Sequence, residues 1–151
     1  MSSFPAKMKQ IYLVLSFMLV ISIVQSRIDF IDCGTNNISV KKIKLSGCMY
    51  VPCQIQRGSD YFVQLVLASL DSRFDAVEVT AYVSLFGALF PVNATTMTPT
   101  FYNDQEALLE FKLVFCQSLL RNRALLYLQA TYKSGPEITG HLCVSFKVQL
   151  V

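Results

Sequence analysis

The sequence after its first 26 residues predicts an all-β fold of two packed sheets. Three observations support this prediction. Hydrophobic residues recur mainly with a period of two, short turn motifs separate these runs, and all five cysteines follow an apolar leader. Seven or so short strands with turns at this spacing are typical of an immunoglobulin-like β-sandwich.

The leader has the organisation of a signal peptide. Lys7 and Lys9 precede the apolar run 11–24, and small or β-branched residues follow at its end. A signal anchor is the alternative interpretation. We therefore expect residues 1–26 to be removed and the mature chain, 27–151, to form one domain.

Alternation identifies the individual strands. In residues 76–86, valine, alanine and leucine alternate with Glu78, Thr80 and Ser84, as in a half-buried strand. Two N-terminal strands are expected as well, and the slipping alternation between Val40 and Ile43 predicts a bulge in the second. These two strands cover residues 28–32 and 38–45, and the remaining expected strands cover residues 61–68, 126–133 and 144–150.

The segment 104–123 is ambiguous between a helix and a strand. It contains good helix formers, and Leu108, Phe111 and Phe115 share a helical face. With a period of two, Phe111, Leu113 and Phe115 also share one face of a strand. We favour a strand because the neighbouring segments are strands, with a helical turn near Gln105 as the alternative.

Composition argues against several function classes. The mature chain has eleven basic and ten acidic side chains, so no electrostatic pattern favours nucleic acid as a partner. The single histidine, His141, lies in a turn, and no Gly-x-Ser-x-Gly or phosphate loop appears. We expect no enzyme, no cofactor and no metal, although spacing alone leaves paired carboxylates open.

Cys48 and Cys53 are expected to form a disulfide. They are five positions apart, and Pro52 favours a turn between them rather than a helix. A metal site is the alternative interpretation, but such a site needs further ligands, and His141 is the only histidine. A disulfide suits the oxidising compartment that the leader predicts.

Cys33 is then expected to pair with Cys143, which joins the first strand to the last. A bridge closing about 110 residues stabilises by roughly 4–5 kcal/mol in the chain-entropy model. Cys116 is left over. We expect it to be a buried thiol, with an intermolecular disulfide as the alternative.

Two kinds of surface chemistry are suggested. The sequons that begin at Asn37 and Asn93 are permitted glycosylation sites in a secreted protein. Lys41, Lys42 and Lys44 form a small basic cluster. It is either a solvated strand or a contact with an anionic lipid surface.

The cysteine framework resembles the ML (myeloid-differentiation-related lipid-recognition) domains, most of all their branch of Niemann–Pick type C secreted sterol-transfer proteins. The shared pattern is Asp32-Cys33-Gly34, Cys48-x4-Cys53 with a proline before its second cysteine, the segment 54–58 leading into an apolar strand, and Leu142-Cys143. The sterol carriers have a third disulfide in a proline-rich central loop, whereas residues 89–103 contain no cysteine here.

This resemblance implies a lipid carrier whose apolar cavity lies between the two sheets, filled by a sterol or another hydrophobic lipid. A membrane surface or a lipid-receiving protein is the implied partner, and the implied location is extracellular or endolysosomal. Phe90 and Pro91 resemble the segment at the mouth of the pocket in the sterol carriers. The candidate lining, which could equally be ordinary core, is Leu45, Val63, Leu65, Phe90, Pro91, Phe111, Leu113, Phe115, Leu126, Leu128 and Phe146.

Two other functions stay open. The segment 134–137 followed by Leu142-Cys143 is also similar to the branch that serves innate immune receptors, which implies a lipid-recognition accessory module. An immunoglobulin-like interaction ectodomain with a fully packed core and no ligand is the alternative from another class.

Overall fold

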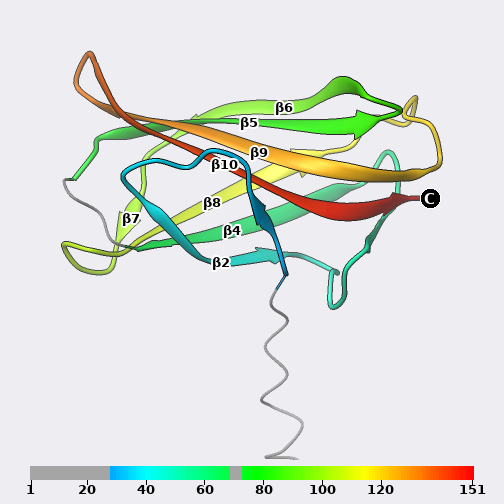
Figure 1. Ribbon diagram of the computed structural model, residues 1–151, viewed down its shortest axis with the longest axis horizontal. Helices are drawn as coiled ribbons and strands as arrows, with labels where there is room; N and C mark the ends of the chain where they lie inside the picture. Colours follow the sequence, from blue (N-terminus) through cyan, green and yellow to red (C-terminus); the bar gives the residue numbers. More distant parts are fainter. Residues whose placement is uncertain (1–27, 69–72) are drawn as a thin grey trace, which may run out of the picture.

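The computed structural model describes residues 28–68 and 73–151 (Figure 1). The expected signal peptide and Arg27 lie outside the described residues. All regular structure in the described part is β-strand. The strands are β1 (Ile31–Asp32), β2 (Ser39–Leu45), β3 (Cys53–Ile55), β4 (Asp60–Ala68), β5 (Ala76–Leu85), β6 (Ala88–Met97), β7 (Thr100–Phe101), β8 (Ala107–Val114), β9 (Arg123–Ser134) and β10 (Glu137–Leu150).

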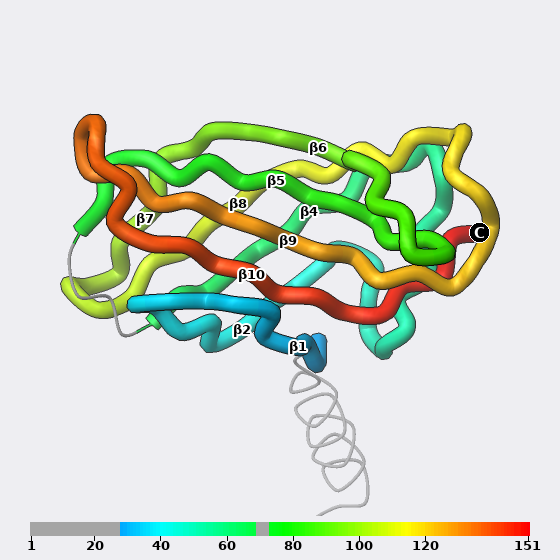
Figure 2. The backbone as a smooth tube through the Cα atoms, turned by 45° about the horizontal axis from the view of Figure 1, so that its top comes forward, coloured from blue at the N-terminus to red at the C-terminus, as the bar shows by residue number. Residues whose placement is uncertain are grey.

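The strands form two facing sheets, so the predicted sandwich is confirmed (Figures 1 and 2). One sheet has the order β1-β10-β9-β5-β6, and β3 also pairs with β10. The other has the order β2-β4-β8-β7. All neighbours are antiparallel except β3 and β10, which run parallel. We call them the six-stranded and the four-stranded sheet.

The core lies between the sheets because each strand turns its alternate apolar residues inward. In β5, Val77, Val79 and Val83 are at most 1% exposed, whereas Glu78, on the other face, is exposed. Leu65 of β4 is fully buried. Burial of apolar surface stabilises by about 25 cal/mol per Å², so this alternation supplies the main driving force for the fold.

Several expectations can be compared with the strands. Within the ambiguous segment 104–123, Ala107–Val114 form β8, so the favoured strand assignment is confirmed there, and residues 115–122 form a turn and irregular structure. The predicted bulge is present, since the β2–β4 register shifts between Val40 and Lys42. Residues 89–103, the expected central loop, instead supply most of β6 and the short β7. β6 forms because its backbone pairs along the whole of β5.

The first disulfide joins Cys33 to Cys143 within the six-stranded sheet. The turn after Cys33 is held by Asp32, whose Oδ1 accepts the backbone N–H groups of Gly34 at 2.9 Å and Thr35 at 2.8 Å. These two hydrogen bonds, that from Thr35 above all, lower the pKa of the Asp32 carboxyl. This part of the cysteine framework therefore holds β1 against β10.

The second disulfide joins Cys48 to Cys53 and closes one long edge of the sandwich. Cys48 follows β2 of the four-stranded sheet, and Cys53 begins β3, which pairs with the six-stranded sheet. The opposite edge lies between β6 and β8. There the Asn93 amide donates to the Lys112 carbonyl at 2.7 Å. One edge is thus tied covalently, whereas the other is held by this hydrogen bond and by the packing of β6 side chains against the core.

Candidate functional site

Most of the predicted lipid-lining residues meet in the interior. Nine of the eleven side chains are at most 6% exposed and belong to one continuous hydrophobic cluster. They come from both sheets: β2, β4 and β8 on one side, and β9 and β10 on the other. These nine are Leu45, Val63, Leu65, Phe111, Leu113, Phe115, Leu126, Leu128 and Phe146.

The predicted mouth lies at the β6 edge, but its two residues face different sides. Phe90 pairs with Val83, whose side chain is buried between the sheets, so Phe90 lies on the inner side and is 40% exposed. Pro91 pairs with Tyr82, which the register places on the outer side. Of the two residues, Phe90 is therefore the one on the inner side, at the edge and outside the set of side chains packed against the core.

One groove lies on the outer face of the four-stranded sheet, and it is larger than the groove on the six-stranded sheet. Its volume is about 800 Å³, and the outward side chains of Lys44, Phe62 and Glu110 line it. A second groove, on the outer face of the six-stranded sheet, has a volume of about 520 Å³. Between the sheets, the predicted lining residues are in mutual contact as a core. A lipid in the interior therefore requires the two sheets to separate locally.

Tyr132 is a polar group in this interior that the sequence-based list omits. Its side chain is fully buried, and its hydroxyl has no hydrogen-bond partner among the described residues. Burial raises the pKa of this phenol, because the anion loses its hydration. The ring packs against Phe74, with 4.7 Å between the two ring centroids. The signal was available: Tyr132 continues the inward alternation of Leu126 and Leu128.

The expected basic cluster on β2 is divided. Lys41 forms an ion pair with Glu106, so its charge is balanced at the surface. Lys44 instead lies beside the larger groove. The three lysines therefore do not act as one free basic patch.

Cys116 is exposed, so the expectation of a buried thiol was wrong. It follows Phe115, which turns inward, and Cys116 consequently points outward at the start of a turn. Its Sγ lies 2.9 Å from Oγ of Ser118. Hydrogen bonds from the side chain and backbone of Ser118 lower the pKa of the Cys116 thiol.

The two sequons occupy different environments. Asn37 is exposed in the loop before β2. Asn93 is half-buried in β6, and its amide nitrogen already donates to the Lys112 carbonyl.

His141 lies on the exposed side of β10, with Nδ1 3.5 Å from the Thr131 hydroxyl. Within residues 28–68 and 73–151, no group of three or more His, Cys, Asp or Glu side chains is placed to hold a metal ion. In the same part of the chain, no helix is long and apolar enough to span a membrane.

Comparison with solved structures identifies proteins of similar fold. A Niemann–Pick type C2 protein from the Japanese carpenter ant superposes with a TM-score of 0.62, covering 82% of this chain and 99% of that chain. The two proteins share the fold. Their sequences are 16% identical. The C-terminal domain of wzt superposes with a TM-score of 0.57 at 11% identity, covering 83% of this chain and 80% of that one. No protein-family model and no curated protein matches the sequence.

Proposed function

We propose that this protein binds and transfers a hydrophobic lipid, a sterol or a fatty acyl lipid, that is buried reversibly between the two sheets. The observation that carries the proposal is the fold shared with the ant protein, together with an apolar interior that has Phe90 at its edge. The cysteine framework's resemblance to ML domains supports the same function. No covalent step is involved.

The two edges of the sandwich suggest how the lipid enters. The edge at β2 and β3 is held by the Cys48–Cys53 disulfide, whereas Asn93 holds the β6–β8 edge through a hydrogen bond. A hydrogen bond contributes only about 1 kcal/mol net and breaks reversibly, so the second edge can open without breaking a disulfide, at the cost of that bond and of the β6 side-chain packing. Phe90 lies at that edge, where a lipid would pass it first.

Burial of the lipid offsets the cost of opening. Apolar area removed from water contributes about 25 cal/mol per Å², and a sterol or acyl chain brings a large apolar area into contact with the side chains of both sheets. The two disulfides suit an oxidising compartment, which supports an extracellular or endolysosomal location.

The experiment is native mass spectrometry of the secreted protein, followed by lipid extraction and by displacement of a fluorescent sterol and a fluorescent fatty acid. We expect bound lipid, or saturable binding of one probe. Phe90→Asp should weaken that binding, because it puts a charge at the opening. Tyr82→Asp, on the outer face, is the matched control. An empty protein that binds neither probe contradicts the proposal.

The contacts within the interior favour one second candidate, an immunoglobulin-like interaction module that carries no lipid. It predicts that the purified protein contains no lipid and binds neither probe. The same measurement therefore separates the two functions.

A further inference from the structure

The turn between β5 and β6 displays an aromatic residue where the backbone disfavours one. Phe86 and Gly87 have φ values of 53° and 83°. Two such residues are typical of a type I′ hairpin, for which Asn-Gly is the preferred sequence. Phe86 is nevertheless retained there, and it is 80% exposed. A strained residue that gains no packing suggests a role outside the fold.

Further apolar residues surround this tip. Leu89, which is 60% exposed, pairs with Ser84 on the outer face, and Ser84 pairs with Leu125 of β9. Leu125 pairs in turn with Lys147 of β10. One row of side chains thus runs across the sheet, from the apolar tip to a lysine.

Basic side chains border the row. Arg123 and Lys147 line the 520 Å³ groove together with Leu125, and Arg121 is exposed in the preceding turn. The ion pairs found among the described residues use none of these three cations. Together with Phe86 and Leu89, they form what we call the hairpin-tip face.

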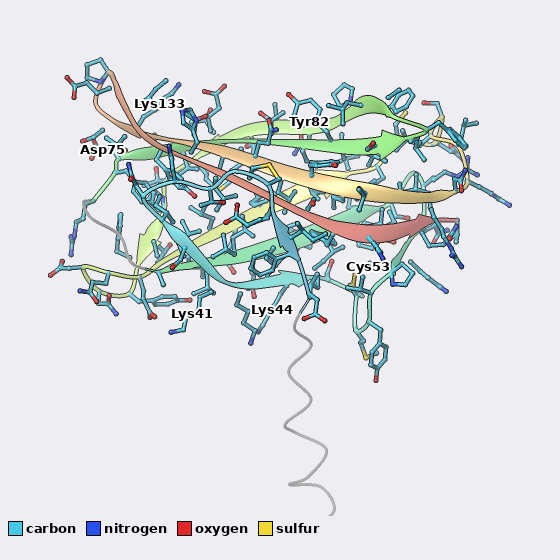
Figure 3. All side chains as sticks on the ribbon, in the orientation of Figure 1. Lys41, Lys44, Cys53, Asp75, Tyr82 and Lys133 are labelled. Atoms are coloured by element: carbon cyan, nitrogen blue, oxygen red, sulfur yellow. A yellow bond between two sulfur atoms is a disulfide. The ribbon has the colours of Figure 1, made fainter. Side chains whose placement is uncertain are left out.

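Negative charge lies elsewhere. The segments 84–91, 118–125 and 145–150, which build this face, contain no acidic residue. Figure 3 shows Asp75 and Lys133, which is paired with Glu78, at the opposite end of the sandwich from the β5–β6 turn. In Figures 1 and 2, the β5–β6 turn, the turn before β9 and the end of β10 gather at one end. The face at that end is therefore apolar and cationic, and Asp60, at the start of β4 at the same end, is ion-paired with Lys112.

We propose that the hairpin-tip face docks on an anionic membrane surface, with Phe86 and Leu89 in the boundary between headgroups and acyl chains, and Arg121, Arg123 and Lys147 on anionic headgroups. Exposed apolar residues flanked by unpaired cations suit such a surface, where each basic residue adds to binding and the apolar residues insert. The inference assigns a membrane partner to a particular face and lipid charge, and it does not depend on the proposed function because docking needs no lipid cargo.

The test is cosedimentation of the mature protein with vesicles of phosphatidylcholine alone and of phosphatidylcholine mixed with phosphatidylserine. We expect binding to the mixture, weaker binding to phosphatidylcholine alone, and loss of binding as salt is raised. Phe86→Asn should weaken binding about tenfold, because it removes the inserted aromatic area. Arg123→Gln and Lys147→Gln should each weaken binding about fivefold.

Phe86→Asn is suited to this test because it creates the preferred Asn-Gly turn, so the fold should be retained or stabilised. Ile138→Asn is the matched control: Ile138 is 58% exposed in β10, near the β9–β10 turn at the other end, and its replacement should leave vesicle binding unchanged.

Three results overturn the inference. They are no binding of the wild-type protein to the mixed vesicles, equal binding by Phe86→Asn, and a dimer in sedimentation velocity that Phe86→Asn abolishes while vesicles do not bind. The last result assigns the face to a second copy of the chain. Displacement of the fluorescent sterol and fatty acid is measured separately on each variant, so failure of docking and failure of lipid binding are distinguishable.

Discussion

Cys116 has a perturbed thiol whose reactivity can be measured directly. Hydrogen bonds from Ser118 stabilise the thiolate and lower its pKa. The pH midpoint for alkylation by iodoacetamide should therefore lie below the value of about 8.5 for an ordinary cysteine. Ser118→Ala should raise the midpoint and slow alkylation at neutral pH. An unchanged midpoint in this variant would show that the Ser118 hydroxyl does not act on the thiol.

The two sequons should differ in occupancy. A glycan on the Asn93 amide nitrogen would replace one of its two hydrogens and crowd the space between β6 and β8, where that nitrogen donates to Lys112, whereas Asn37 is open to solvent. We expect protein from a secretory host to carry one N-glycan, which Asn37→Gln removes and Asn93→Gln leaves in place. Intact mass before and after enzymatic deglycosylation gives the answer. Two glycans on the folded protein would contradict it.

At the scale of single residues, the sequence predicts which side chains are buried better than it predicts which face of the sheet an edge residue occupies. Val63 and Leu126 are correctly placed in the interior, because period-two alternation directly reports which face is buried. Phe90 and Pro91 face opposite sides because they are neighbours in β6, a segment that the sequence presents as a loop. Which of them faces inward follows from the two-residue turn after Leu85, which pairs Phe90 with Val83.

The next scale is the element, where the β6–β8 edge gives a test of opening. Asn93→Ala removes the hydrogen bond to Lys112 and should destabilise the fold by about 1 kcal/mol. If this edge opens for lipid, bound lipid should also leave about fivefold faster in stopped-flow transfer to acceptor vesicles. The reason is that the same bond must break in the opening step.

Thr95→Val is the control for this variant, because it also removes the sequon but keeps the Asn93 amide. An exchange rate equal to that of wild type in Asn93→Ala, together with the expected loss of stability, would place the lipid's path at another edge.

The strands that sequence reasoning finds and misses differ in burial. β5 and β9 are evident because every second residue is buried, which produces regular alternation. β6 contains no fully buried residue, since it is the outermost strand of its sheet, and so it reads as a loop. β3 is only three residues long and acquires its conformation by parallel pairing with β10. Both strands are therefore defined by their pairing partners rather than by a pattern in their own residues.

The whole molecule depends on β10 and its disulfide. Replacing both Cys33 and Cys143 with serine removes a bridge of sequence separation 110 and should cost about 4–5 kcal/mol of unfolding free energy. Replacing Cys48 and Cys53, which are five positions apart, should cost about 2 kcal/mol in the chain-entropy model. Urea unfolding of both double variants gives the order. The reverse order would indicate that the short bridge acts mainly by joining the sheets.

The fold of the whole molecule was predictable, while its opening was not. Two facing sheets follow from the alternation of apolar and polar residues and from the cysteine framework, and both patterns can be recognised in the sequence. The proposed opening of the sheets rests on the positions of the Cys48–Cys53 disulfide and of the Asn93 hydrogen bond at the two edges. That distribution is a property of the topology and appears only when the strands are assembled.

The position of β10 at the end of the described chain also determines when the six-stranded sheet can form during synthesis. β10 pairs with β1, β3 and β9, and it supplies the partner of Cys33. At a synthesis rate of roughly 5–20 residues per second, Cys143 follows Cys33 by roughly 5–20 s. During that interval Cys33 has no native partner, while Cys48 and Cys53 emerge together and can join at once. The six-stranded sheet is therefore completed late, and until then the nascent chain must keep Cys33 from bonding to Cys48, Cys53 or Cys116.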